Sequence, residues 1–245
     1  MGAMSSLKAA AIAVRSKALL QTRRLTRPKV VRHAGVNLEI GDHLSPIIIE
    51  YIYSGQYEKS ELKGLRRNLE PDDIVMEIGA GIGFISLQCA RRIGADRVFA
   101  FEANPALEQH IRRNYDLNGL HPTLEIGLLG EQAGECDFYV ERDFWVSSLH
   151  PSPTARRVSI AVRPLNEAVR RVAPTFLVMD VEGGEYDLIR LIDFQGIRKL
   201  NIELHEDLIG AEKIEFIRRR VLDAGFAIDP ELSKNQQLFA SRPRS

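Results

Sequence analysis

A glycine-rich turn is the first stretch at which this chain could bind a ligand. Residues 77–83 read Glu-Ile-Gly-Ala-Gly-Ile-Gly and follow a short apolar run. Glycines at such a corner let a strand turn sharply into a helix and let a ligand approach the backbone closely. Several nucleotide-containing cofactors are bound in this way, so the turn alone indicates a cofactor site without identifying the cofactor. A purely structural corner with a solvated Glu77 is the alternative.

The residues around this turn favour S-adenosylmethionine (SAM) over a dinucleotide. The dinucleotide pattern requires a third glycine where Phe84 stands. Glu77 would repel a pyrophosphate at the mouth of the turn, whereas it would attract the ammonium and sulfonium groups of SAM. Glu102 follows Gly83 by 19 residues, at the end of the next predicted strand, where a carboxylate can accept hydrogen bonds from both ribose hydroxyls. Because Glu102 would serve NAD equally well, an NAD-dependent oxidoreductase stays open.

A second group of polar residues follows two strands predicted later in the chain. Asp180 and Glu182 come directly after the apolar run 177–179, and Glu203 and His205 end the next strand pattern. The carboxyl ends of neighbouring parallel strands form one rim, where ligands bind in open α/β sheets. Side chains of these types could supply a base for a hydroxyl, orient a substrate or bind a divalent ion through oxygen. His205, which titrates near neutral pH, Asp180 and Glu182 are therefore candidate catalytic residues; a solvated His205 is the alternative.

Periodicity predicts the elements that hold these two groups together. From residue 71 onward, apolar strand patterns alternate with helical patterns, which is typical of a parallel sheet covered by helices on both faces. A close pair of short strands at the end of the chain adds one antiparallel strand at or near the sheet edge. We predict strands at 74–78, 97–102, 124–128, 135–140, 158–162, 176–181, 199–204, 226–228 and 238–240, and helices at 84–93, 105–118, 185–194 and 211–224.

The composition is that of one globular α/β domain. The chain has 245 residues, of which 44% are apolar and 27% are charged, as in average soluble proteins. The sequence contains no run of about 18 apolar residues, so no transmembrane helix is expected. Cys89 and Cys136 have no metal-binding spacing, and two unpaired thiols fit a reducing compartment. We therefore expect a cytoplasmic protein that holds no metal.

Basic residues are concentrated at the N-terminus. Eight Lys and Arg side chains precede the first acid, Glu39, and the rest of the chain carries 25 basic and 33 acidic side chains, a net charge of −8. An acidic body is a poor surface for nucleic acid, so no nucleic-acid partner is expected. A helical apolar spacing over residues 5–25 predicts an amphipathic helix, which could dock on the domain, pair with another copy or lie weakly on an anionic membrane. Its apolar stripe consists of Leu7, Ala11, Val14, Ala18 and Leu25. This arm is also Arg-rich and acid-poor, like a transit peptide.

In these motifs the chain resembles the FkbM family of SAM-dependent methyltransferases, from about residue 50 to residue 240. The family usually has Asp where Glu77 stands, Asn where Gly81 stands and Pro where Ala103 stands. A carboxylate is kept at the first of these positions. The matching pieces are Tyr57-Glu58, Glu61, residues 77–83, Phe101-Glu102, Asn104-Pro105, Asn114, Leu117-Asn118, Gly134, Phe138-Tyr139-Val140, Ser148-Leu149, Asp180-Val181-Glu182-Gly183, Glu185 and Glu203-Leu204-His205.

The resemblance implies a Rossmann-like class I methyltransferase fold, with a mostly parallel seven-stranded sheet, one antiparallel strand and helices on both faces. It implies O-methylation of a hydroxyl on a small metabolite, such as a sugar, a polyketide or another natural product, by in-line transfer from SAM assisted by a base of the rim. Residues 1–38 would be a basic arm that can form a helix, residues 39–70 a helical lead-in that covers the cofactor site, and residues 71–245 the SAM-binding core. The residues expected to bind SAM are Tyr57, Glu61, Glu77, Gly79, Ala80, Gly81, Gly83, Phe84, Glu102, Ala103, Asn104 and Asp180.

Three other classes of function stay open. A methyltransferase acting on protein or RNA could use the basic arm to bind its substrate. A protein that binds SAM without catalysis would share the glycine turn but would not depend on the rim residues. The NAD-dependent oxidoreductase is the least favoured, because Phe84 and Glu77 argue against it.

We predict that Glu102→Ala weakens SAM binding by about 1.5–3 kcal/mol, the range for a hydrogen bond to a charged group. Calorimetric titration of the wild type and the variant measures the difference. An unchanged dissociation constant would remove Glu102 from the cofactor site.

Overall fold

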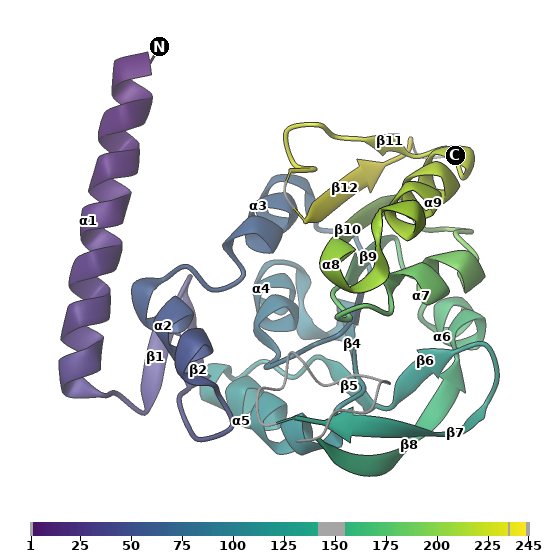
Figure 1. Ribbon diagram of the computed structural model, residues 1–245, viewed down its shortest axis with the longest axis horizontal. Coiled ribbons are helices and arrows are strands. Elements are labelled where there is room, and N and C mark those ends of the chain that lie inside the picture. The colour runs from purple at the N-terminus through teal and green to yellow at the C-terminus, as the bar shows by residue number, and fades with distance from the viewer. Residues whose placement is uncertain (1, 142–154, 235, 244–245) are drawn as a thin grey trace.

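The computed structural model describes residues 2–141, 155–234 and 236–243, with side chains from residue 13 onward. Within the described residues, the chain forms one large sheet, a small three-stranded sheet and an N-terminal hairpin (Figure 1). The Ser148-Leu149 motif and the turn-rich stretch 150–154 lie outside the described residues.

The large sheet has seven strands in the order β11-β12-β10-β9-β3-β4-β5, and β12 alone runs antiparallel to its neighbours. This confirms the predicted sheet, including its single antiparallel strand. The order reverses at β3, which lies between β4 and β9, and such a switch point is where open α/β sheets bind ligands. The strands are β3 (Val75–Ile78), β4 (Val98–Glu102), β5 (Thr123–Ile126), β9 (Phe176–Met179), β10 (Lys199–Glu203), β11 (Ala227–Ile228) and β12 (Gln237–Ser241).

Alternate residues of the central strands feed two hydrophobic cores, one on each face of the sheet. In β9, Phe176 and Val178 pack in the first core, and Leu177 and Met179 pack in the second. This period of two is what a fully covered parallel strand requires, so helices on both faces are confirmed. The first core contains side chains of α3 (Lys59–Asn68), α4 (Phe84–Ile93) and α5 (Glu108–Asn118), and the second those of α6 (Leu165–Val172), α7 (Glu185–Leu191) and α9 (Ala211–Asp223).

Short elements connect these helices and strands. The helical turn η2 (Pro105–Leu107) leads into α5, and the Asn104 side chain caps it by accepting a hydrogen bond from the Ala106 N–H at 3.0 Å. The turn η1 (Ala95–Arg97) precedes β4, and α8 (Glu206–Ile209) precedes α9. The predicted strands 135–140 and 158–162 belong to a separate sheet of order β6-β8-β7, formed by β6 (Leu128–Gly130), β7 (Gly134–Val140) and β8 (Arg156–Pro164).

An N-terminal β-hairpin, which the sequence analysis did not predict, packs against α5. It consists of β1 (Val30–His33) and β2 (Val36–Glu39), and α2 (Pro46–Ser54) follows it. Asn118 and Asn114 on α5 accept hydrogen bonds from the backbone N–H groups of Asn37 and Glu39, at 2.8 and 2.7 Å. Two asparagine side chains thus hold β2 beside α5, the helix that follows β4.

The predicted N-terminal helix forms, and its described part contacts α2. Helix α1 (Gly2–Thr26) lies at one side of the molecule beside α2 (Figure 1). Arg23 donates to the carbonyls of Ile52 and Tyr53 at the end of α2, at 3.1 and 2.8 Å. Val14 and Leu25 of the predicted apolar stripe are 70% and 86% exposed, so these two residues do not dock on the domain. Pairing with another copy and weak binding to an anionic membrane stay predictions.

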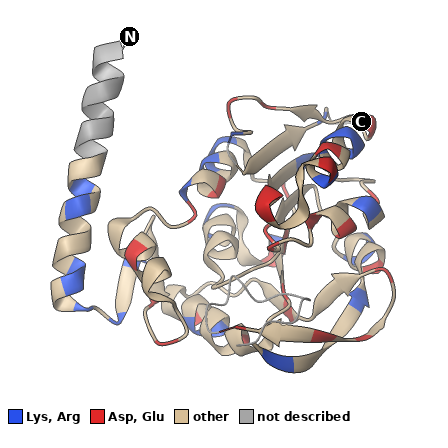
Figure 2. Ribbon diagram, viewed as in Figure 1, with Lys and Arg blue, Asp and Glu red and all other residues tan. Residues whose placement is uncertain are grey.

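Charge on the described part of α1 comes from Lys and Arg alone (Figure 2). A salt bridge between Arg24 and Glu50 adds a second polar link to α2. Among the described residues, no helix is both long enough and apolar enough to cross a membrane.

The corner between β3 and α4 requires glycine at two positions. Gly79 has a φ of 89°, and a Cβ atom there would lie 1.6 Å from the carbonyl oxygen of Asp180. Gly83 has a φ of 75°, and a Cβ atom there would lie 2.8 Å from a ring atom of Tyr115. The N–H of Gly79 also donates to the carbonyl of Phe101, at 2.9 Å. The turn therefore touches the ends of both neighbouring strands, β4 and β9.

We predict that Gly79→Ala destabilises the fold far more than Gly225→Ala. The φ values of the two glycines, 89° and 84°, are nearly the same, but nothing lies within 4 Å of a Cβ atom at Gly225. Left-handed backbone strain then costs about 1–2 kcal/mol at either position, and the clash with Asp180 should bring the loss at Gly79 above about 4 kcal/mol. Urea unfolding measures both free energies. Equal losses of stability in the two variants would contradict the close contact between Gly79 and the backbone of Asp180.

Candidate functional site

A cavity of about 920 Å³ opens at the carboxyl ends of β3, β4, β9 and β10. This is the switch point of the sheet, and the volume is within the usual range for small-molecule sites. The segment between α2 and α3 closes one side of the cavity, and β6 and β7 contribute Leu129 and Phe138 to its wall.

Most of the residues predicted to bind the cofactor line this cavity. Ten of the twelve do so. The other two, Gly83 and Asn104, contact neighbouring elements instead. Gly83 faces Tyr115 and Ile111 on α5, and Asn104 caps η2. The twelve positions therefore come together around one space, as the sequence analysis predicted; their roles toward a ligand remain predictions.

Glu102, at the end of β4, is a buried carboxylate held by the backbone. One oxygen, Oε2, accepts from the N–H of Gly81 at 2.8 Å, and the other, Oε1, accepts from the N–H of Asn104 at 2.7 Å. Burial raises the pKa of Glu102 to about 7, although the backbone N–H donors oppose that effect. Each oxygen keeps a further lone pair, so the carboxylate could accept from two hydroxyl groups of a ribose.

Glu77, at the end of β3, is buried rather than solvated. Glu77 is 2% exposed, and its Oε2 has no hydrogen-bond partner among the described residues. Burial raises its pKa well above the ordinary value. Glu61 on α3 is 4% exposed, and burial followed by the nearby Glu58 raises its pKa in the same direction. Both carboxyl groups thus line the same cavity, where a bound proton or a cation would neutralise their charge.

The N-terminal hairpin positions two aromatic residues at the cavity. His33 on β1 stacks on the Phe84 ring, with centroids 4.9 Å apart, and its Nε2 lies 2.9 Å from the carbonyl oxygen of Tyr57. The Tyr57 and Phe84 rings are in contact, at 5.5 Å between centroids. His33 was not predicted as a site residue, because the hairpin that carries it was not predicted.

His205 lies at the centre of the second predicted group. Its Nδ1 is 2.6 Å from Oε1 of Glu185, and its Nε2 is 3.2 Å from Oε2 of Glu182 and 3.7 Å from Oδ1 of Asp180. Burial lowers the pKa of His205, but the hydrogen bond to Glu185 and the nearby carboxylates outweigh burial and raise it overall. His205 is only 8% exposed, so it is not the solvated side chain of the alternative interpretation.

Glu185, at the start of α7, fixes the orientation of this imidazole. Glu185 is fully buried, and its Oε1 also accepts from the N–H of Gly183 at 3.0 Å. It was quoted in the family motif but was absent from the predicted site. Its distance from Glu182 in the sequence, three residues, was the signal that could have placed it beside the rim.

Carboxyl groups crowd the part of the cavity near His205. Oxygen atoms of Glu58, Asp180 and Glu203 lie within 4.8 Å of one another. Burial raises the pKa of Asp180 well above the ordinary value and raises those of Glu58 and Glu182 to about 7. Glu203 was predicted to lie on this rim but was given no role, and Glu58 was quoted only in the family motif.

Two of these carboxyl groups stand on strained backbone. Glu58 and Glu182 have φ values of 48° and 46°, a left-handed conformation that is uncommon for residues other than glycine. Strain of this kind persists where the surrounding structure enforces it, and it concentrates at ligand sites. Both residues line the cavity.

The charge of the lining determines which ligands fit. Carboxyl groups outnumber basic side chains by nine to two in the lining, and the two are Lys59 and His205. Like charges repel strongly where water is excluded, so a phosphate or pyrophosphate would fit poorly here. SAM fits, because its ammonium and sulfonium would lie among carboxylates and its ribose beside Glu102. The acidic residues are Glu58, Glu61, Glu77, Glu102, Asp180, Glu182, Asp187, Glu203 and Asp207.

Two ligand sets in the cavity also have the composition that divalent ions accept. One is Asp180, Glu182 and His205, and the other is Glu58, Asp180 and Glu203, each with its donor atoms within 4.8 Å. No metal was expected from the sequence, and that expectation remains a prediction.

One curated protein resembles part of this chain in sequence, and several solved structures resemble it in fold. The ribosomal protein L11 methyltransferase of Oceanobacillus iheyensis is 31% identical over 65 residues, which are 26% of this chain and 20% of that protein. The match thus spans about a fifth of that relative's length.

Among solved structures, the ribosomal protein L11 methylase of Lactobacillus delbrueckii subsp. bulgaricus superposes with a TM-score of 0.49 and 14% identity, over 78% of this chain and 80% of that one. A methyltransferase from Pyrococcus furiosus superposes with a TM-score of 0.48 and 12% identity, over 93% and 96%. These likenesses are too distant to bear on function, and the fold class rests on the strand order described above.

The model of the methyltransferase FkbM domain matches residues 77–228, well over half of the chain. The match begins at Glu77 and includes the glycine turn, Glu102 and the residues around His205, so it covers the cavity's main lining. The chain therefore belongs to the FkbM methyltransferase family, and its methyl donor is S-adenosylmethionine.

Proposed function

We propose that this methyltransferase methylates a hydroxyl group of a small, uncharged or cationic acceptor, with His205 as the base. The observation that carries the proposal is the orientation of His205. Its Nδ1 is engaged by the buried Glu185, and its Nε2 points toward the carboxylates of the cavity. His205, Asp180 and Glu182 keep the roles predicted for them, with Glu185 as a positioning residue.

The Glu185–His205 pair has the arrangement that a general base needs. A carboxylate can only accept, so the hydrogen bond at Nδ1 places the proton of the neutral imidazole on that atom. Nε2 is then the basic nitrogen and can remove the proton of an acceptor hydroxyl. Glu182 and Asp180 lie 3.2 and 3.7 Å from Nε2, where they stabilise the imidazolium that results.

Bound SAM supplies an electrophilic methyl group, whose transfer also removes the sulfonium charge. The acidic lining therefore favours the positively charged donor over S-adenosylhomocysteine, the product that lacks this charge. Glu102 would hold the ribose at one end of the cavity, and Glu61 and Glu77 would lie near the charged end of the donor.

Apolar side chains at the cavity support an acceptor with an apolar portion. Ile48, Tyr51, Phe138 and Leu208 line it together with the carboxylates. Tyr51 and Leu208 are 50% and 62% exposed, so they are available at the entrance. A hydroxylated natural product such as a polyketide or a sugar derivative combines these features, whereas RNA would bring phosphates toward nine carboxyl groups.

We predict that SAM stabilises the protein more at pH 8 than at pH 5.5. Glu58, Glu102 and Glu182 have pKa values of about 7 in the folded protein, against 4.5 ordinarily. Folding therefore takes up protons, and the stability that these groups contribute is present below pH 4.5 and is lost as the pH rises through 7. A cationic ligand offsets this loss.

Thermal unfolding with and without ligand at the two pH values measures the effect. The increase in Tm on adding SAM should grow with pH, and the increase on adding S-adenosylhomocysteine should grow less. A SAM effect that is independent of pH, or equal for both ligands, would contradict the charge argument.

We predict that His205→Asn lowers kcat by about 10²–10⁴-fold, the usual contribution of a general base, and leaves binding of S-adenosylhomocysteine within about twofold. Glu185→Gln should lower kcat less and shift the pH profile, because the amide no longer fixes the imidazole as a carboxylate does. His121→Asn is the control, since that side chain is 65% exposed.

The assay follows the labelled methyl group of SAM into a panel of hydroxylated metabolites, with RNA and protein substrates tested in parallel. Transfer to a hydroxylated small molecule that depends on His205 supports the proposal. Transfer to RNA or protein alone, or full activity in His205→Asn, would overturn it.

A further inference from the structure

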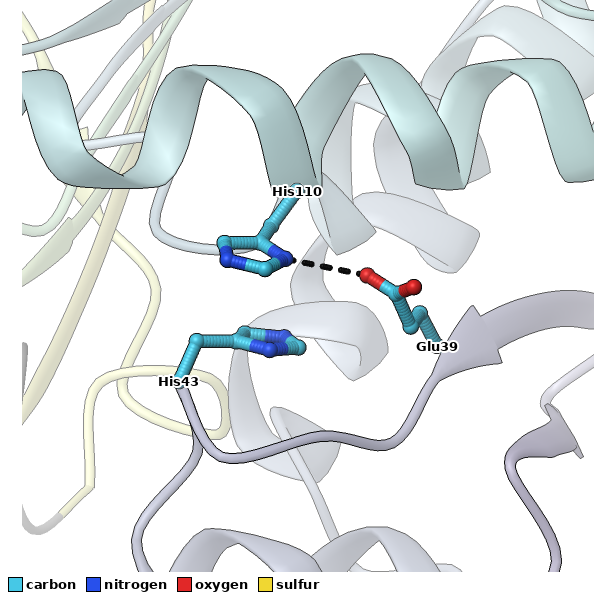
Figure 3. Close-up of side chains that lie close together, drawn as sticks. All are labelled: Glu39, His43 and His110. Atoms are coloured by element: carbon cyan, nitrogen blue, oxygen red, sulfur yellow. Dashed lines mark hydrogen bonds and ion pairs between the residues drawn. The ribbon is translucent and has the colours of Figure 1, made fainter.

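We propose that Glu39, His43 and His110 form a binding site for a divalent transition-metal ion such as Zn²⁺, separate from the cavity. Glu39 ends β2, His43 lies in the loop between β2 and α2, and His110 is on α5 (Figure 3). Figure 3 shows the two imidazole rings one above the other, beside the Glu39 carboxylate. None of the three residues lines the cavity.

The donor atoms of the three residues already lie close together. Nδ1 of His110 is 3.0 Å from Oε2 of Glu39, and one donor atom from each residue lies within 4.8 Å of the others. Two imidazoles and one carboxylate are a ligand set that Zn²⁺ accepts, with a water molecule in the fourth position. Glu39 and His110 are each 29% exposed in their side chains, so an ion can enter from solvent.

His43 has a nitrogen that the protein leaves without a partner. Its Nε2 is buried and makes no hydrogen bond to any residue that the structure describes. Buried polar atoms are nearly always paired, and an exception calls for an explanation. A coordinated ion would give this nitrogen a partner.

The stacked rings would have to tilt on binding. The His43 and His110 centroids are 3.6 Å apart, with 11° between the ring planes, so their in-plane lone pairs run side by side rather than converging on one point. Gly41 stands two residues before His43 in the loop, and the loop side chain can tilt more readily than His110, which is fixed on a helix.

The site would strengthen a connection that leads to the cofactor turn. The N–H of Glu39 donates to Asn114, and the Asn114 side chain donates to the carbonyl of Ile82 at 2.9 Å. Ile82 belongs to the glycine turn, and Asn114 lies one helical turn after His110. An ion that ties Glu39 and His43 to His110 would therefore fix the hairpin to α5 and stabilise the fold beside that turn.

The test uses the full chain, freed of metal with a chelator and then titrated with Zn²⁺ by calorimetry and followed by Tm. Co²⁺ in place of Zn²⁺ adds an absorption spectrum that reports tetrahedral coordination by nitrogen and oxygen. We expect one ion per chain, a higher Tm on binding, and at least tenfold weaker binding in His43→Gln and in His110→Gln. Glu39→Gln keeps an acceptor for His110 but removes the charge, and it should weaken binding while the fold is retained.

Two control variants separate this site from other sources of binding. His121→Gln removes an exposed histidine that lies 3.8 Å from Asp116, and His205→Gln removes the histidine of the cavity. Both should bind Zn²⁺ like the wild type. Loss of binding in His205→Gln with normal binding in His43→Gln would place the ion in the cavity and overturn the proposal, as would the absence of a Tm increase with Zn²⁺ or equal affinity in all variants.

Discussion

The burial of several carboxyl groups in one cavity is the constraint on which the rest of this structure depends. Glu61, Glu77 and Asp180 have pKa values raised mainly by burial, and all three face the same cavity. An apolar lining would be more stable, so the fold must hold these groups in place by other means. It does so with two hydrophobic cores on either side of the sheet and with Gly79, which brings the first turn against the backbone of Asp180. In the proposed function, a cationic donor and the imidazolium of His205 would offset the cost of burying these groups.

The same constraint links the fold to catalysis. In the proposed mechanism, His205 is the side chain of the acidic rim that takes up the proton, and its buried partner Glu185 determines which nitrogen faces the acceptor. On the other side of β3, Glu102 is held through backbone N–H groups. The carboxylates at the two ends of the cavity thus differ in their partners: Glu102 accepts from backbone N–H groups, and Glu185 pairs with the His205 side chain as well as with the N–H of Gly183.

Local patterns in the sequence predicted the sheet and most of the residues that line the cavity near the glycine turn, because strand periodicity and the spacing of that turn from Glu102 depend on neighbouring residues only. Contacts between distant segments could not be predicted in this way. Glu185 becomes a partner of His205 only when β9 and β10 lie side by side. The hairpin has just two short alternating runs. Helix α1 contacts α2 through the Arg23 guanidinium, while Val14 and Leu25 of its apolar stripe are exposed.

The central claim is that the cavity binds SAM through a turn and a carboxylate that dinucleotide enzymes partly share. Calorimetric titration of the purified protein with S-adenosylhomocysteine, and separately with NAD, tests it most directly, because Glu102 suits both riboses while the acidic lining suits only one cofactor. We expect micromolar binding of S-adenosylhomocysteine and no binding of NAD. Binding of NAD without S-adenosylhomocysteine would contradict the account.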